Sequence, residues 1–201
     1  ATHVGSVNTI TNEGGRLIGS TTDGPGMLRA FDEAGVSLDD KRVLFLGTGG
    51  AVRAVAFAVA EQSRADSVMI LGRTQGNVDT LVQDLNDKTN GTIAGGSLDE
   101  DLRKAVTNHD VIIQGTPVGM APDESTLVPA ALLRSDQAAF DMVYRPLKTR
   151  FLRDAEAAGC ATVLGIEMLI NQAALQFECW TGADCPTDAM RSTALSALDA
   201  S

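Results

Sequence analysis

A cluster of small residues, Gly47-Thr48-Gly49-Gly50-Ala51, follows four apolar residues and opens an alanine-rich stretch that continues to Glu61. This pattern is typical of a buried strand, a tight turn and the start of a helix. Backbone N–H groups at a helix start are unpaired and carry partial positive charge, so they favour a phosphate. Glycine also leaves room for a diphosphate to approach the backbone. The alternative is a turn without a ligand, because Gly-x-Gly alone is a weak signal.

Arg73 and Thr74 follow the next predicted strand, residues 67–71. In a dinucleotide-binding fold this strand ends beside the adenine ribose, where NAD-binding proteins place an Asp or Glu. An Arg there can instead pair with a 2′-phosphate, and a Thr can add a hydroxyl donor. The residues therefore favour NADP over NAD, and the alternative is a solvated surface Arg.

Two other places could carry chemistry. Asp23 stands before Gly24 at a predicted helix start, where its carboxylate is either an N-terminal cap or a group that positions substrate. The segment Gln114-Gly115-Thr116-Pro117-Val118-Gly119-Met120 follows an apolar strand. It either borders a cofactor crevice or forms an ordinary turn. The residues alone decide neither the role of Asp23 nor that of this segment.

The elements that would position these residues alternate along the chain. Apolar strands are predicted at 43–46, 67–71, 91–94, 110–114, 138–143 and 161–164, with helices at 51–61, 76–86, 99–106 and 149–158 and a helical turn at 129–133. This order predicts an α/β fold, a doubly wound, Rossmann-like parallel sheet covered on both faces. A hairpin over residues 7–19 and a helix from about Asp23 precede the sheet, and C-terminal helices follow from Ile166.

The composition excludes several classes of protein. A formal net charge of −10 argues against non-specific binding to nucleic acid or an anionic membrane, and no apolar run is long enough to span a bilayer. The odd number of cysteines and the absence of Cys-x-x-Cys spacing indicate a reducing compartment, so we expect a cytoplasmic protein. His3 and His109 are isolated, so both are predicted to be surface or loop residues, and no metal site is expected.

Seven short motifs, in this order and spacing, resemble the shikimate dehydrogenase family over residues 1 to about 182. They are Val7-Asn8-Thr9, Gly19-Ser20-Thr21-Thr22-Asp23-Gly24-Pro25-Gly26, Gly47-Thr48-Gly49-Gly50-Ala51-Val52-Arg53, Arg73-Thr74, Thr116-Pro117-Val118-Gly119-Met120, Asp141-Met142-Val143-Tyr144, and Gly165-Ile166-Glu167-Met168-Leu169 with Gln172. Each motif is weak alone, and the ordered set is specific.

The resemblance implies a reaction and a set of site residues. The reaction is the reversible NADPH-dependent reduction of 3-dehydroshikimate to shikimate, a step in the biosynthesis of chorismate and the aromatic amino acids. Asp23 is then the catalytic carboxylate, which acts with a Lys in proton transfer, and Asn8, Tyr144 and Gln172 bind the substrate together with Asp23. The implied cofactor-binding residues are Gly47, Thr48, Gly49, Gly50, Ala51, Arg73, Thr74, Thr116, Met142 and Gly165.

Three positions depart from the family pattern: Thr21, Gly72 and Asn77. Thr21 and Gly72 each stand where the family usually has Asn, and Val52 takes the place of a third glycine, as is usual in the family. Asn77 occupies a position that often carries a second basic residue, so only Arg73 remains as a strong phosphate clamp. An NAD-using quinate/shikimate dehydrogenase is therefore the alternative enzyme.

The family's amino-terminal substrate domain and its catalytic Lys find no match in this sequence. The four lysines stand in other contexts: Lys41, Lys88, Lys104 and Lys148. We expect residues 1–22 to be the last piece of that domain, 23–165 the NADP-binding domain, and 166–201 helices that return toward the substrate domain. The chain would belong to a longer polypeptide or to a fusion with dehydroquinate dehydratase, and a homodimer is possible in the family. Alone it is expected to be nearly inactive, and a non-catalytic nucleotide-binding module is the remaining alternative.

Overall fold

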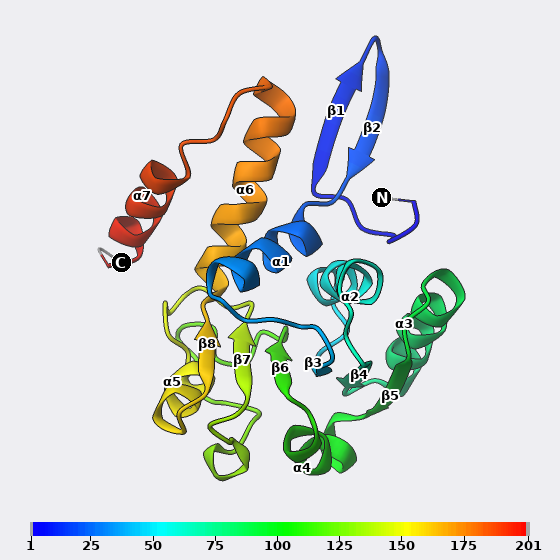
Figure 1. The fold of residues 1–201 in the computed structure, drawn as a ribbon, viewed down its shortest axis with the longest axis vertical. Coiled ribbons are helices and arrows are strands. Elements are labelled where there is room, and N and C mark those ends of the chain that lie inside the picture. Colours follow the sequence, from blue (N-terminus) through cyan, green and yellow to red (C-terminus); the bar gives the residue numbers. More distant parts are fainter. Residues whose placement is uncertain (1, 200–201) are drawn as a thin grey trace.

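The computed structural model describes residues 2–199 and consists of a β-hairpin, a parallel sheet and the helices around it (Figure 1). Residues 1, 200 and 201 of the predicted terminal segments lie outside the described residues. The hairpin is formed by β1 (Thr9–Glu13) and β2 (Arg16–Ser20). The sheet strands are β3 (Arg42–Leu46), β4 (Ser67–Gly72), β5 (Ile93–Ser97), β6 (Val111–Gln114), β7 (Ala138–Asp141) and β8 (Ala161–Val163). The helices are α1 (Asp23–Glu33), α2 (Gly50–Gln62), α3 (Gln75–Lys88), α4 (Leu98–Asn108), η1 (Ala130–Leu132), α5 (Arg150–Ala157), α6 (Gly165–Thr181) and α7 (Thr187–Asp199).

The sheet is parallel throughout the described chain, with the strand order β5-β4-β3-β6-β7-β8. From β3 the chain first moves outward to β4 and β5, then returns to the other side of β3 for β6 to β8. Adjacent loops diverge at such a reversal and leave a crevice at the carboxyl ends of the strands, between β3 and β6. The predicted doubly wound α/β fold is confirmed.

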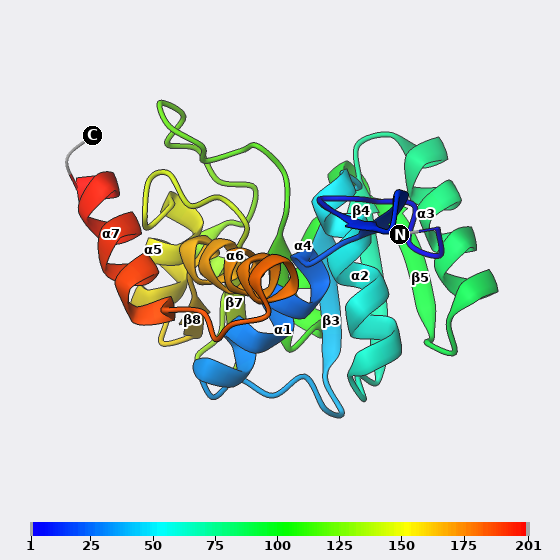
Figure 2. The same ribbon diagram turned by 90° about the horizontal axis from the view of Figure 1, so that it is seen from above.

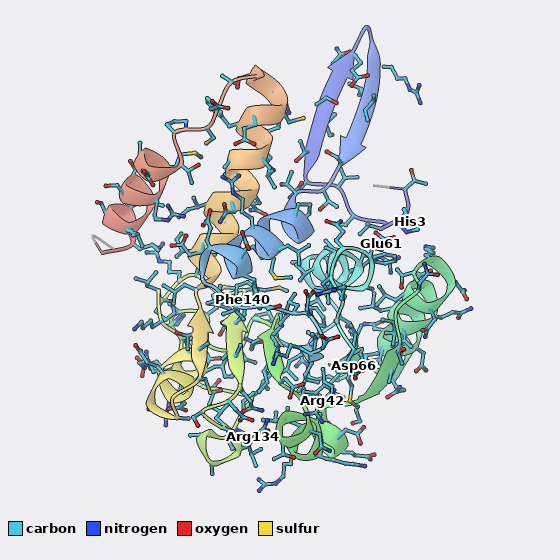
Figure 3. All side chains as sticks on the ribbon, in the orientation of Figure 1. His3, Arg42, Glu61, Asp66, Arg134 and Phe140 are labelled. Atoms are coloured by element: carbon cyan, nitrogen blue, oxygen red, sulfur yellow. The ribbon has the colours of Figure 1, made fainter. Side chains whose placement is uncertain are left out.

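Successive side chains along each strand point to opposite faces of the sheet and so enter two separate hydrophobic cores. In β3, Val43 and Phe45 face the core under α1, α2, α3 and α6, whereas Leu44 and Leu46 face the core under α4, η1 and α5. The two groups of helices lie on opposite sides of the sheet (Figure 2). On the first face, the rings of Phe31 in α1 and Phe140 in β7 meet edge to face with centroids 5.4 Å apart, where Figure 3 shows Phe140 beneath α1.

Some predicted boundaries were wrong. The strand predicted at 91–94 is β5 at Ile93–Ser97, which places Gly95 and Gly96 inside a strand. A Cβ at Gly95 would lie 2.6 Å from Val78 of α3, so glycine allows this helix to approach the strand closely. The strand predicted to reach residue 143 ends at Asp141.

His109 lies in the loop before β6, in agreement with the prediction of a surface or loop residue, and it is buried. Its Nδ1 is 2.7 Å from the carbonyl oxygen of Ala105, and burial lowers its pKa. Exposed His3 contacts Glu61 on α2, and Figure 3 labels this pair above that helix. In residues 2–199, no group of three or more His, Cys, Asp or Glu could hold a metal ion, and no helix is long and apolar enough to cross a membrane.

An ion pair at the amino edge of the sheet supports a first prediction. The guanidinium of Arg42 donates two hydrogen bonds to Asp110, at 3.0 and 2.7 Å, and its backbone N–H donates a third at 2.9 Å. These bonds hold the pKa of this carboxyl at about 2. Because that pKa lies below its unfolded value, the pair stabilises the fold above about pH 4 and loses this effect as the pH falls toward 2. Asp110→Asn should cost about 1 kcal/mol in urea unfolding at pH 7 and about half of that at pH 3. An equal cost at both pH values would contradict this assignment.

Candidate functional site

The loops at the carboxyl ends of β3, β4 and β6 enclose a cavity of about 300 Å³. Several of the predicted cofactor residues meet here although they are far apart in the sequence. The lining residues are Gly47, Thr48, Gly49, Gly72, Arg73, Thr74, Asn77, Leu98, Gly115, Thr116 and Pro117.

The glycine turn has the geometry of a phosphate cradle. Gly47 has a φ of 113°, which favours glycine, and its N–H donates to the carbonyl of Leu71. Gly49 precedes the first turn of α2, and a Cβ at Gly49 or Gly50 would meet no atom within 4 Å. The turn therefore presents a helix N-terminus to open space, where a diphosphate can approach the backbone.

Arg73 and Thr74 lie at the other end of the same cavity, between β4 and α3. Both residues are exposed, and no carboxylate in residues 2–199 forms an ion pair with Arg73. Gly72 explains one departure from the family pattern, since a Cβ there would lie 2.7 Å from Val78 and 3.0 Å from Thr48. Asn77 faces the cavity but adds no positive charge.

A second cavity of about 680 Å³ continues from the first past Gly115, Thr116 and Pro117. It contains four of the predicted residues, Ala51, Thr116, Met142 and Tyr144, and Leu198 of α7 also lines it. Gly165 lies behind Met142 at the start of α6. A Cβ there would lie 2.5 Å from the carbonyl oxygen of Asp141. This glycine allows the close contact between α6 and the end of β7.

Asn8 and Asp23 form a direct pair. The Nδ2 of Asn8 donates to Asp23 at 2.8 Å, while its Oδ1 accepts from the N–H of Thr22 at 2.9 Å and from the hydroxyl of Thr9 at 2.8 Å. These contacts fix the amide so that its donor faces the carboxylate. Burial raises the pKa of Asp23, and the hydrogen bond from Asn8 opposes part of this rise.

The glycines after Asp23 place this pair beside the sheet. Gly24 contacts α2, where a Cβ would lie 2.9 Å from the carbonyl oxygen of Ala54, one turn from Ala51 in the larger cavity. Gly26 contacts α6, where a Cβ would lie 2.8 Å from the backbone nitrogen of Gln172. Helix α1 is therefore held between α2 and α6, which brings Asp23 and Gln172 to neighbouring helices. Tyr144 lies with Met142 in the larger cavity, outside the hydrogen bonds of Asn8 and Asp23.

The structure adds residues that the sequence did not single out. Gln176 of α6 donates to the carbonyl of Asn8 at 3.3 Å and to the hydroxyl of Thr9 at 3.2 Å, and Trp180 donates to the carbonyl of Ile10 at 3.1 Å. These bonds fasten the hairpin to α6 and so position Asn8. The only signal in the sequence was their spacing of four along one helix face.

Arg53, the last residue of the glycine motif, turns away from the cavity. It donates to the carbonyl of Val4, forms a 2.6 Å ion pair with Asp84 of α3 and lies over the ring of Phe57. It anchors the amino-terminal segment to α2 and α3.

Comparison with known proteins gives the same family along nearly the whole chain. The family Shikimate / quinate 5-dehydrogenase matches residues 29–130, and the Shikimate 5'-dehydrogenase C-terminal domain matches residues 165–195. A shikimate dehydrogenase (NADP(+)) of Pyrococcus abyssi is 43% identical over 98% of this chain and 70% of its own length.

Solved structures agree with the sequence comparison. Shikimate 5-dehydrogenase of Listeria monocytogenes, in complex with shikimate and NAD, superposes with a TM-score of 0.90 and 35% identity over 96% of this chain and 68% of its own. Shikimate 5-dehydrogenase of Thermus thermophilus, in complex with NADP(H) and shikimate, superposes with a TM-score of 0.84 and 36% identity. The match covers 98% of this chain and 70% of the other. With its glycine turn at one edge of a doubly wound sheet and its Asn8–Asp23 pair beside α2, the chain belongs to the shikimate dehydrogenase family.

Proposed function

We propose that this chain takes part in the reversible NADPH-dependent reduction of 3-dehydroshikimate to shikimate, in the biosynthesis of chorismate and the aromatic amino acids. One observation carries the proposal. Gly24, the residue after Asp23, packs on α2, and the start of α2 contributes Gly49 and Ala51 to the two cavities, so the Asn8–Asp23 pair lies beside the helix that opens both of them. A dinucleotide in these cavities and a small polyhydroxy acid at the Asn8–Asp23 pair can therefore meet beside the start of α2.

The cofactor is held by the residues of the two cavities. The open backbone at Gly49 and Gly50 suits the diphosphate, and unpaired Arg73 with Thr74 suits the 2′-phosphate. Thr116, Met142 and Gly165 shape the ribose and nicotinamide side. When bound there, NADPH supplies the hydride that the reaction needs.

Asp23 is the group that handles the proton. Its raised pKa makes the carboxyl a better proton carrier near neutral pH than an exposed Asp, and Asn8 holds it in one orientation. Asn8 hydrogen-bonds the ring hydroxyls of the substrate, Gln172 binds it from α6, and Tyr144 lines the same pocket. The second proton-transfer group of the family is a Lys, which the four lysines of this sequence do not supply.

The domain boundaries follow the same proposal. Residues 1–22 are the last part of a substrate-binding domain, 23–165 the nucleotide-binding domain, and 166–201 helices that return toward the substrate side. Support comes from apolar side chains exposed on the hairpin and beside it, namely Val7, Ile10, Leu17 and Trp180, which suit a covered surface. The remaining substrate domain is the proposed cover, and a homodimer is the alternative. The three unpaired cysteines support a cytoplasmic location.

Arg73→Ala tests the cofactor. Losing charge-assisted hydrogen bonds of about 1.5–3 kcal/mol to the 2′-phosphate should weaken NADPH binding by about 10- to 100-fold. NADH lacks this phosphate, so its affinity should stay the same. Titration of each nucleotide, followed by its fluorescence, measures both effects.

Arg103→Ala on α4 is the matched control, because this Arg is also exposed but lies outside the cavities. It should change neither affinity. Equal, tight binding of NADH and NADPH that Arg73→Ala does not alter would reject the NADP assignment and favour the NAD-using quinate/shikimate dehydrogenase.

A further inference from the structure

Asp141, at the end of β7, is a fully buried carboxylate that the proposed chemistry does not use. It receives three hydrogen bonds from three different segments. The hydroxyl of Thr149 donates to Oδ2 at 2.6 Å, the N–H of Val143 donates to Oδ1 at 3.0 Å, and the amide of Gln114 makes a long bond of 3.5 Å to Oδ1. A cluster of donors around one acid side chain indicates the ionised form, which only accepts.

Gln114 extends this network into the loop that separates the two cavities. Its Nε2 donates to the carbonyls of Thr116 at 3.1 Å and Val118 at 2.9 Å, and its Oε1 accepts from the N–H of Thr116 at 2.6 Å. Thr116 lines both cavities. The conformation of this loop is therefore fixed by the side chain that touches Asp141.

The second segment runs from Met142 to Thr149 and carries Tyr144 and Arg145 into the larger cavity. Asp141 holds its first residues through the N–H of Val143 and its end through Thr149. The hydroxyl of Thr149 also accepts from the N–H of Leu152 at 3.4 Å as the N-cap of α5, so its proton is directed to Asp141.

We propose that Asp141 is a positioning residue for cofactor binding, which holds the 115–120 and 142–149 loops in place through Gln114, Val143 and Thr149. The proposal rests on the proposed function, because it assigns these loops to the nicotinamide half of the site. Asp141 lines neither cavity, so it acts only through the groups that it holds.

Ionisation of Asp141 should then control the loops. Burial raises its pKa to about 6, against the opposing hydrogen bonds from Thr149 and Val143. Charged groups on neighbouring elements have their own partners or lie in solvent: Lys148 pairs with Glu156, Glu167 pairs with Arg191, and Arg145 is exposed. A proton on Asp141 would oppose the donor from Thr149 or Val143 and loosen the 142–149 loop.

Asp141→Asn keeps the shape but places an N–H₂ donor against Thr149 or the N–H of Val143. Calorimetric titration of the 201-residue chain with NADP⁺ should show affinity lower by on the order of tenfold at pH 7.5. Near pH 5 most wild-type Asp141 is protonated, so the ratio of the two affinities should approach one. Protonation of the 2′-phosphate of NADP⁺ changes both affinities by the same factor, so it cancels in their ratio.

The free energy of unfolding should change with pH in the opposite direction to the affinity for NADP⁺. Because the pKa of Asp141 is raised on folding, its contribution to stability is largest below about pH 4 and falls as the pH rises through 6. Asp141→Asn should lack this fall, so it should lose affinity at neutral pH without a matching loss of stability. A ratio of affinities that stays constant with pH, or equals one at pH 7.5, overturns the proposal.

Thr149 provides a second pair of variants in case Asp141→Asn does not fold. Thr149→Ser keeps the hydroxyl and should bind NADP⁺ like the wild type, whereas Thr149→Val should bind more weakly, with its pH midpoint moved upward. Equal binding by both variants overturns the proposal. If the wild-type chain itself does not bind NADP⁺, the proposed function fails instead, so the two failures are distinguishable.

Discussion

The 201-residue chain is expected to oxidise shikimate with NADP⁺ about 10²- to 10⁴-fold more slowly than the relative from Pyrococcus abyssi, although it binds the cofactor. That range is typical for the loss of one proton-transfer partner. Asp23 and Asn8 provide one half of the proton-transfer pair. The other half is a Lys in the family, and this chain has none in that context.

The positions of the four lysines are the structural reason. Lys88 pairs with Asp84 on α3, and Lys148 pairs with Glu156 on α5. Lys41 precedes β3 at the amino edge of the sheet, the edge opposite the cavities, and Lys104 lies exposed on α4. In the described chain, none of them forms a hydrogen bond or an ion pair with Asn8 or Asp23.

The assay compares both proteins at the same enzyme, shikimate and NADP⁺ concentrations and follows NADPH absorbance. Binding of NADPH to the same sample is the control that the chain is folded. Turnover comparable to that of the relative, and abolished by Asp23→Asn, would contradict the prediction. It would mean that the groups of this chain suffice for proton transfer. Binding without any turnover would instead agree with the nucleotide-binding module.

The glycine turn and the sheet could be predicted from sequence because both depend on local patterns. Strand β3 reads as a run of apolar residues whose alternate members enter two cores, and the turn after it needs glycine at Gly47. The error at β5 has a local cause too, since Gly95 and Gly96 look like a turn until α3 is placed against them.

The polar contacts around the site could not be predicted in the same way. Gln176 and Asn8 are 168 positions apart, and Asp141 lies 27 residues from Gln114, so these pairs exist only after the sheet and helices have assembled. Asp141 was visible only as part of a family motif. Its hydrogen bonds to Thr149 and Gln114 became apparent from the structure.

The second large effect is expected at Gly165, where one methyl group should destabilise the fold. A Cβ on this residue would lie 2.5 Å from the carbonyl oxygen of Asp141, 2.7 Å from that of Val143 and 2.9 Å from the carbonyl carbon of Met142. All three are backbone atoms, so no side-chain rotation relieves the overlap. Gly165→Ala should therefore cost about 3 kcal/mol or more, because α6 must move away from β7.

Gly49→Ala is the matched control, since the same methyl group there meets no atom within 4 Å. Because Gly49 is the N-cap of α2, the change should lower the free energy of unfolding of the protein by about 1 kcal/mol or less. The added methyl group would stand where the diphosphate approaches the backbone. Losing one charge-assisted hydrogen bond there should weaken NADPH binding by about 10- to 100-fold.

Urea unfolding and NADPH titration of the two variants separate the two uses of glycine in this family. At Gly165, glycine permits contact between parts of the protein, so stability should fall first and affinity only as a consequence. At Gly49, glycine leaves space for a ligand, so affinity should fall while the fold remains. If Gly49→Ala bound NADPH as tightly as the wild type, the turn would not be the diphosphate site. If Gly165→Ala had the same urea midpoint of unfolding as the wild type, α6 would have to accommodate the extra methyl group without loss of stability.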